Sequence, residues 1–245
     1  MRRILTLALV ITALACLPAF ATNSGELFLN DGIDTATITF TGSTATCTGT
    51  CGGLTEIYSP TPGAGLTVIG TFDGIFALNI TGQGLPSVNS PTLENLNQIN
   101  SDNLSSSSET LTVDFEYLGY SVPNALLLGV SSTINSGIAS STVGFTAYDD
   151  SSDGLPAILG AGTLIGGFTE TGLSSANSGA FATPFTGTAS LTEQTVLGYT
   201  GNGAIQANFS ISQTPEPASV IFLGTAMLGL GALLRKRLQR NNVNA

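Results

Sequence analysis

Strict alternation of apolar and polar residues marks the central part of the chain. In residues 35–41, three apolar side chains alternate with four threonines, a pattern typical of a β-strand with one buried face. Residues 111–117 repeat this pattern with apolar and aromatic side chains on one face. Asp114 and Glu116 occupy the other face, which we expect to meet water. Both segments therefore predict half-buried strands.

Further runs of the same kind indicate that the domain is built from strands throughout. Asp73-Gly74 is a strong hairpin turn signal between two of these runs. Together the runs predict eight to ten strands. The clearest runs are residues 66–72, 75–80, 143–147 and 205–211, and the weaker ones are residues 126–130, 158–165 and 191–199.

The connecting segments are rich in Gly, Ser, Thr and Asn, and no long helical periodicity precedes Ala218. Residues 87–108 predict a long polar loop with at most a short helix around residues 93–99, and residues 174–178 predict a second loop. The pattern favours an all-β fold, an antiparallel β-sandwich of the immunoglobulin-like or jelly-roll-like type. A β-barrel or a short β-solenoid is the alternative, although no repeat of fixed period supports the solenoid.

The first 21 residues predict a secretory signal peptide. Arg2 and Arg3 provide a positive start, residues 4–15 form an apolar run, and a small-x-small cleavage motif follows. Cleavage after this motif would give the mature N-terminus. The residues of the predicted cleavage site are Ala19, Ala21 and Thr22.

Two alternatives for the N-terminal segment stay open. An uncleaved membrane helix is one, although the apolar run is short compared with the roughly 20 residues that span a bilayer. The other is a lipoprotein modified on Cys16, although Ala13 stands where such motifs favour Leu or Val.

The C-terminal segment predicts a single transmembrane helix. Residues 218–234 form an uninterrupted run of 17 apolar and small residues, and Arg235, Lys236 and Arg237 follow directly. Positive charge at this end favours a cytoplasmic C-terminus. The main domain would then lie outside the cytoplasm, in agreement with the signal peptide.

A short motif, Pro215-Glu216-Pro217, stands directly before this apolar run. The block from residue 215 to residue 237 resembles the PEP-CTERM sorting signal of Gram-negative bacteria. The resemblance implies recognition by an exosortase-type membrane transpeptidase, processing near the motif, and delivery to the cell surface or the extracellular polysaccharide matrix. It implies no particular activity for the outer domain. An ordinary C-terminal anchor after a Pro-rich hinge is the alternative.

These signals divide the chain into three predicted parts. The parts are a signal peptide (1–21), an extracytoplasmic β-sandwich domain (22–212) and a sorting signal (213–245) with its motif (215–217), transmembrane helix (218–234) and basic tail (235–245).

Charge is distributed very unevenly along the chain. The sequence has 6 Lys+Arg, 16 Asp+Glu, no His and a net charge of -10, and every basic residue lies before Ile4 or after Leu234. Such a surface repels phosphate backbones, which excludes nucleic acid as a partner. The missing His also excludes imidazole-based catalysis and His-ligated zinc.

Cys47 and Cys51 are the two cysteines of the predicted mature chain. In an oxidising compartment they favour a local disulfide that closes a short loop. A redox-active or metal-binding pair is the alternative, but no second cysteine pair, histidine or basic neighbour supports it.

Asp149, Ser151 and Asp153 place several hard oxygen atoms in one turn after the predicted strand 143–147. Calcium prefers such ligands, so these residues are a candidate calcium site. The closing bidentate Glu of an EF-hand is missing, and a solvated acidic turn is the alternative. We expect no other cofactor.

The residues favour a non-catalytic protein. Asp114 and Glu116 could form a glycosidase acid/base pair, but two positions apart on one face they are expected to keep a strand soluble. A hydrolase without His, Lys or Arg also has few ways to stabilise developing negative charge.

The sequence thus predicts an exported cell-surface or extracellular-matrix protein with a structural or adhesive role. We expect exopolysaccharide, the membrane and an exosortase-type enzyme as its partners. The alternative is a calcium-dependent carbohydrate-binding module, although the chain has no Trp to form a sugar-stacking platform.

Overall fold

The computed structural model describes mainly the central part of the chain. The described residues are 24–59, 61, 65–84, 92–122, 127–136, 140–150, 162–172, 174–182, 187–213, 225 and 227. By its internal contacts the chain divides into two compact units, Met1–Gln213 and Thr214–Ala245.

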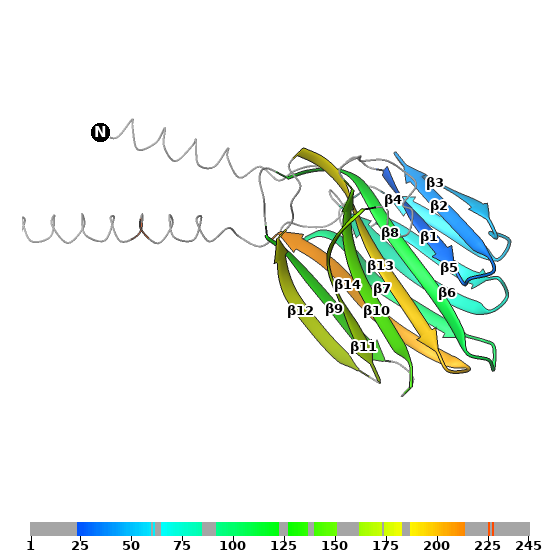
Figure 1. Cartoon of the computed structure of the whole chain (residues 1–245). Coiled ribbons are helices and arrows are strands. Elements are labelled where there is room, and N and C mark those ends of the chain that lie inside the picture. Colours follow the sequence, from blue (N-terminus) through cyan, green and yellow to red (C-terminus); the bar gives the residue numbers. More distant parts are fainter. Residues whose placement is uncertain are drawn as a thin grey trace, which may run out of the picture. The chain divides into compact units, whose positions relative to one another are not determined.

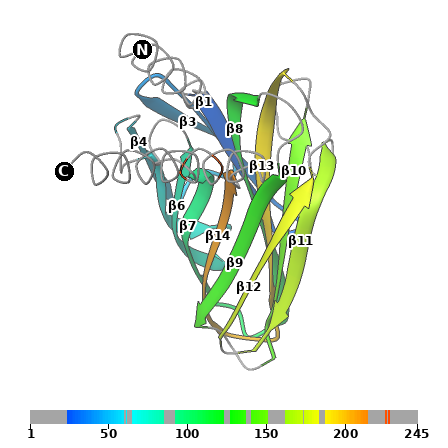
Figure 2. The same cartoon turned by 90° about the vertical axis from the view of Figure 1, so that its left-hand side faces the viewer.

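The described residues form 14 strands in two seven-stranded antiparallel sheets, which stack as a β-sandwich (Figure 1). Figure 2 shows the two layers from the side. Sheet A has the order β11 (Thr163–Thr171), β10 (Thr142–Asp150), β13 (Gly187–Tyr199), β8 (Glu109–Val122), β1 (Ser24–Asn30), β2 (Thr35–Thr41) and β3 (Thr44–Gly49). Sheet B has the order β12 (Ser175–Ala182), β9 (Leu127–Ser136), β14 (Gly203–Gln213), β7 (Thr92–Asn103), β6 (Phe76–Gly84), β5 (Gly65–Phe72) and β4 (Leu54–Ser59).

The all-β, antiparallel sandwich predicted from alternation is confirmed. Residues 35–41 form β2 with the predicted buried face, and Asp73-Gly74 lies in the turn that joins β5 to β6. Asp73 and Gly74 both have positive φ (50° and 69°). This is the backbone conformation that a tight hairpin demands and that Gly adopts without strain.

The first and the last strand both occupy interior positions of their sheets. β1 lies between β2 and β8 in sheet A, and β14 lies between β7 and β9 in sheet B. Each sheet is therefore assembled from segments that are far apart in the sequence.

An aromatic cluster fills the space between the sheets near β2 and β8. The Phe40 ring lies 4.7 Å from the ring of Tyr58, 5.0 Å from that of Tyr117 and 5.8 Å from that of Phe115. The Tyr117 hydroxyl donates a hydrogen bond of 3.3 Å to the Tyr58 hydroxyl from the opposite sheet. The cluster therefore joins sheet A to sheet B by both packing and a polar contact.

Two glycines of β6 make room for this cluster. A Cβ atom at Gly82 would lie 2.4 Å from the Phe115 ring, and one at Gly84 would lie 2.4 Å from the Tyr117 ring. Any side chain at these positions would push the rings of sheet A away from sheet B.

The prediction of a loop with a short helix at residues 87–108 is wrong for residues 92–103, which form the long strand β7, whereas residues 104–108 form a loop as predicted. Leu96 and Ile99 are three residues apart, a spacing that resembles a helix, yet both are fully buried. The pairing of β7 with β6 and β14 shifts register between these two residues. This β-bulge inserts one extra residue, so both side chains face the core.

Residues 174–178 were also predicted to be a loop, but residues 175–182 form β12 at one edge of sheet B. Alternation with large apolar residues could not reveal this strand because its side chains are mostly small. For a related reason the predicted eight to ten strands fall short of the 14 described, since short polar strands such as β3 carry no apolar stripe.

The predicted signal peptide lies outside the described residues, and so does the predicted transmembrane helix except for Thr225 and Met227. These two residues have helical backbone. Among the described residues, no helix has the length and apolar character needed to cross a membrane.

Replacing Phe40 by Ala should destabilise the domain by about 3–5 kcal/mol, because it removes the ring at the centre of the aromatic cluster and leaves a cavity. Chemical denaturation of the two proteins measures the difference. Ile33→Ala is the control: Ile33 is 84% exposed, and its truncation should change the unfolding free energy by no more than about 0.5 kcal/mol. Equal effects of both substitutions would contradict the assignment of the core.

Candidate functional site

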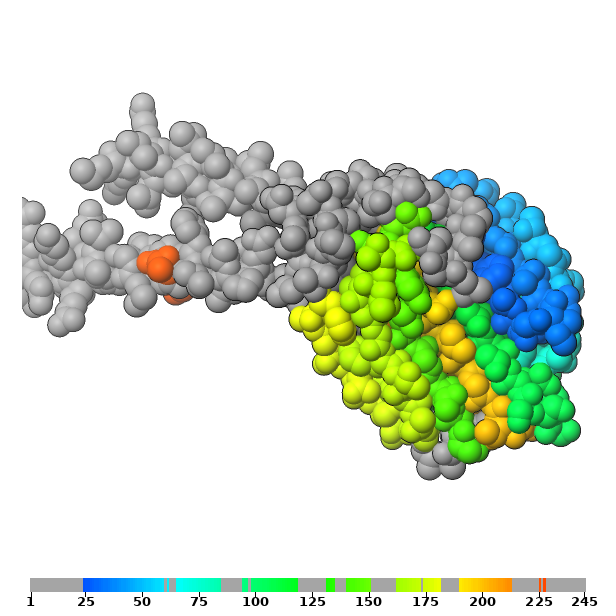
Figure 3. Space-filling view, viewed as in Figure 1, coloured from blue at the N-terminus to red at the C-terminus, as the bar shows by residue number. Residues whose placement is uncertain are grey.

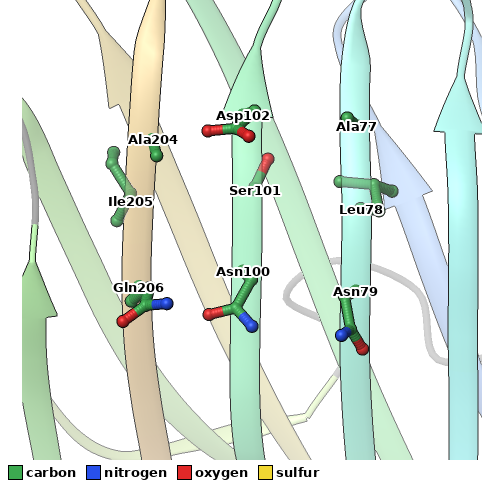
Figure 4. A pocket seen from close by; sticks show the side chains of 9 residues that line it. All are labelled: Ala77, Leu78, Asn79, Asn100, Ser101, Asp102, Ala204, Ile205 and Gln206. Carbon is green, nitrogen blue, oxygen red and sulfur yellow. The ribbon is translucent and has the colours of Figure 1, made fainter.

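The outer face of sheet B carries a polar hollow with a volume of about 270 Å³ (Figure 4). It lies over β6, β7 and β14, which are neighbours in the sheet. The hollow is open to solvent and extends across all three strands. The residues that line it are Ala77, Leu78, Asn79, Asn100, Ser101, Asp102, Ala204, Ile205 and Gln206.

Strand register produces this hollow from two cross-strand rows. Asn79, Asn100 and Gln206 are direct partners and form one row of three amides. Ala77, Asp102 and Ala204 form the next row, in which small side chains stand on both sides of the carboxylate (Figure 4). The small residues leave open space, and the amides line one side of it. At the usual strand spacing each row crosses about 10 Å of the sheet.

A second hollow of about 230 Å³ opens further along β14 on the same sheet. Here Ser210 pairs with Asn95 of β7 and Ser131 of β9. The Ser131 and Ser210 hydroxyl oxygens lie 2.7 Å apart, within hydrogen-bonding distance. Thr133 and Asn208 also line it. From Ala204 to Ser210 the two hollows extend along about 20 Å of strand.

These hollows can recognise hydroxyl-rich ligands. Each Asn or Gln amide offers two donors and a carbonyl acceptor, and each hydroxyl offers both functions. A sugar hydroxyl is likewise both donor and acceptor, so one amide can bind two hydroxyl groups of the same sugar at once. Asp102 is the single ionisable residue among those that line either hollow, and the absence of cations disfavours anionic ligands.

A second set of polar residues lies between the sheets. Glu94 of β7 and Glu193 of β13 are both fully buried. Glu193 Oε2 accepts a hydrogen bond of 2.6 Å from the Leu96 N–H. Neither carboxyl oxygen of Glu94 accepts a hydrogen bond within the described part of the chain. This pair has no basic partner available, because the sequence has none from residue 4 to residue 234.

Burial governs the protonation of this pair. Desolvation raises the pKa of Glu94 well above 4.5, and the charges of Glu193 and Glu116 raise it further. Desolvation also raises the pKa of Glu193, although the backbone N–H groups of Leu96 and Ile211 act in the opposite direction. Like charges this close in a low-dielectric interior disfavour double ionisation of the pair.

Asp114 and Glu116 correct a prediction. Both are on the outer face of sheet A, as expected, but each is only 1% exposed, so they do not face water. Figure 3 looks onto this face, where β8 (green) and β13 (gold) lie side by side. Burial raises the pKa of Asp114 to about 7, the Gln194 amide opposes the rise and the Glu26 charge adds to it. The alternation of residues 111–117 predicted the face on which Asp114 and Glu116 lie, but it could not predict that both side chains are buried there.

Another buried carboxylate joins the two sheets by hydrogen bonds. Glu170 of β11 accepts hydrogen bonds from the hydroxyls of Ser132 and Ser175, which belong to β9 and β12 of the other sheet. Hydroxyl donors here take the place of the Arg or Lys that usually accompanies a buried carboxylate.

Cys47 and Cys51 have their sulfur atoms at bonding distance, so the predicted disulfide is confirmed. The bridge joins the end of β3 to the connection that leads into β4. There Thr50 N–H donates to the Thr35 carbonyl at 2.8 Å. This arrangement is a structural brace for the corner of the sandwich.

The candidate calcium site is only partly described. Asp149 is the penultimate residue of β10 and is 3% exposed, and burial raises the pKa of its carboxyl. Ser151 and Asp153 lie outside the described residues. Within the described ranges, no group of three or more His, Cys, Asp or Glu residues could hold a metal ion. Calcium binding stays a prediction.

The other predicted site residues also lie outside the described part of the chain. They are the cleavage-site residues Ala19, Ala21 and Thr22, the motif Pro215, Glu216 and Pro217, and the basic residues Arg235, Lys236 and Arg237.

The chain was compared with protein-family models and with curated proteins, and neither comparison gave a match. The candidate site therefore depends on geometry and chemistry.

Sequence reasoning missed the amide row altogether. The pattern of residues 204–212 places small and polar side chains at every second position, which could have marked the outer face of β14. The partners Asn79 and Asn100, however, come from strands more than 100 residues earlier in the chain. Only the register between strands brings them beside Gln206.

We expect the domain to lose stability as the pH rises from about 4.5 towards 8. A carboxyl whose folded-state pKa is raised stabilises the folded state below the unfolded-state value, and that contribution is lost as the pH rises through the folded-state pKa. Each carboxyl that stays protonated only in the folded state lowers the unfolding free energy by about 1.4 kcal/mol per pH unit. Denaturant titrations between pH 4.5 and 8 measure this slope.

Glu94→Gln tests the origin of that slope, because it replaces the buried carboxyl by a neutral group of similar shape. The slope should become shallower by up to about 1.4 kcal/mol per pH unit. Asp102→Asn removes an exposed carboxylate and serves as the control, with the slope unchanged. A slope that is equally steep in Glu94→Gln and in the parent protein would contradict the role of this pair.

Proposed function

We propose that this protein is an exported, non-catalytic component of the cell surface or extracellular matrix. In this role the β-sandwich holds matrix polysaccharide on the outer face of sheet B. The observation that carries the proposal is the row of three amides beside the Ala77–Asp102–Ala204 row (Figure 4).

The amide row suits the proposed ligand in both geometry and chemistry. Its side chains are half-buried or exposed, so they are accessible from solvent. They project from three paired strands, and such a rigid platform lowers the entropy lost on binding. Several modest hydrogen bonds along a repeating polymer give useful avidity even where each one is weak.

The ligand class follows from charge. The sequence carries a net charge of -10 and has no cation from residue 4 to residue 234. Anionic polysaccharides would therefore be repelled, whereas neutral hydroxyl-rich chains would be accepted. Binding through amides needs no metal ion, which distinguishes this proposal from a calcium-dependent carbohydrate-binding module.

The non-catalytic character is supported by the chain's side-chain chemistry. A hydrolase stabilises developing charge with cations, oriented imidazoles or equivalent donors. Asp73, in the turn between β5 and β6, has a raised pKa, and the other described carboxyls with raised pKa are buried; none of them lines either hollow.

Export and surface sorting complete the proposal and are supported by the sequence signals at both ends. In this account an exosortase-type enzyme processes the chain near Pro215-Glu216-Pro217. The intact mass of protein recovered from the extracellular material tests this step. A species that starts at Thr22 and ends near Pro217 is expected, whereas a species that keeps residues 218–245 and occurs only in membranes would contradict sorting.

The binding face is tested by the triple variant Asn79→Ala, Asn100→Ala and Gln206→Ala. Its affinity for neutral polysaccharide should fall by roughly tenfold or more, since each lost hydrogen bond is worth about 0.5–1.5 kcal/mol. Affinity electrophoresis in gels that contain neutral or anionic polysaccharides measures the change.

The matched control carries Thr37→Ala, Thr39→Ala and Thr146→Ala on the outer face of sheet A. This triple variant should bind like the parent protein, with or without a calcium chelator. Equal losses in both variants, or binding that chelation abolishes, would overturn the assignment to the amide row.

A further inference from the structure

The sandwich has four edge strands, and these differ in how well they are protected against pairing with another chain. The edges are β11 and β3 in sheet A and β12 and β4 in sheet B. An edge strand presents unpaired backbone N–H and C=O groups, and proteins usually protect it with charge, proline, bulges or short length.

Three of the edges carry such protection. β4 has only six residues and carries Glu56. β3 is equally short and ends at the corner that the Cys47–Cys51 disulfide braces. β11 carries Glu170, and its pairing with β10 is interrupted by a register shift.

β12 lacks all of these features. Its eight residues, Ser175–Ala182, include no charge and no proline, and they pair with β9 in one uninterrupted register. Among the described strands, β12 pairs on one side only. Its exposed residues are small or amide-bearing: Ala176, Asn177, Ser178 and Ala180.

The position of β12 is also fixed at both of its ends. Ser175 donates a hydrogen bond to Glu170, and the ring of Phe181 lies 6.0 Å from that of Phe168. The strand therefore presents a continuous, pre-organised edge about 27 Å long at the usual rise per residue.

We propose that β12 is a self-association edge, at which a second copy of this chain adds its own β12 in antiparallel orientation. The pairing would join two copies of sheet B into one continuous sheet across a two-fold axis. This inference goes beyond the proposed function and does not depend on the polysaccharide-binding face.

Charge opposes a second copy least at this edge. Two molecules that each carry a net charge of -10 repel one another over most of their surfaces. Pairing through β12 brings no carboxylate of this strand near its symmetry mate. Antiparallel pairing of one strand with itself also gives the closed two-fold symmetry that is commonest among oligomers.

Small side chains suit the same arrangement. A two-fold axis near Ser178 and Gly179 would place small or amide-bearing residues opposite one another, except where Phe181 lies opposite Ala176. Backbone hydrogen bonds then supply the association energy, as in other cases of strand addition.

Sedimentation velocity of the full chain over a range of concentrations tests the proposal, with all variants in the same detergent-containing buffer. The parent protein should form dimers as concentration rises. Ser178→Lys places like charges against each other at the paired edge and should weaken dimerisation about tenfold or more. Thr55→Lys adds the same charge to the exposed face of the other sheet B edge, β4, and should leave dimerisation unchanged.

Hydrogen exchange supplies a second measurement that does not depend on the variants. The backbone amides of β12 should become more protected as the concentration of the parent protein rises, while those of β4 stay the same. A parent protein that is monomeric at every concentration would overturn the proposal. So would dimers that Ser178→Lys and Thr55→Lys affect equally, or that form without new protection in β12.

Discussion

The absence of any basic side chain between residues 3 and 235 constrains the whole domain. A protein of this size usually pairs a buried carboxylate with Arg or Lys, because an isolated buried charge is very costly. Here the carboxyls are stabilised in other ways. Glu170 accepts bonds from two serine hydroxyls, Glu193 accepts a backbone N–H, and Asp114 has a pKa of about 7. Neutral donors and raised carboxyl pKa values thus take the place of ion pairs at these positions.

How much of this could be predicted from the sequence varied with the strength of the local pattern. β2 and β8 could be predicted because apolar residues occupy every second position. β7 was not predicted as a strand because its bulge gives Leu96 and Ile99 a helix-like spacing. β12 was not predicted because its residues are mostly small. The amide row could not be predicted, since the register that unites β6, β7 and β14 depends on the complete fold. The same is true of the burial of Asp114 and Glu116.

The two sheets divide their chemistry in a consistent way. Carboxyls such as Asp114 lie on the outer face of sheet A and are buried there. The outer face of sheet B instead carries amides and hydroxyls beside open hollows. Between them lies a core in which aromatic rings meet glycines, as Phe115 meets Gly82. Such close packing keeps sheet B in fixed register. The fixed register in turn keeps the three amides in line, so a change deep in the core can alter the outer face on which we propose that polysaccharide binds.

The interior position of the last strand gives the domain a particular order of assembly. β7 and β9 cannot complete their pairing until β14 is present, and about 100 residues separate β7 from β14. Long-range closure of this kind is slow, and it leaves two strand edges open in the meantime. A chain that emerges N-terminus first, from a ribosome or through a membrane, would expose these edges until its final β segment had followed. Completion of sheet B is therefore coupled to the arrival of β14, which would keep the domain threadable during the export proposed above.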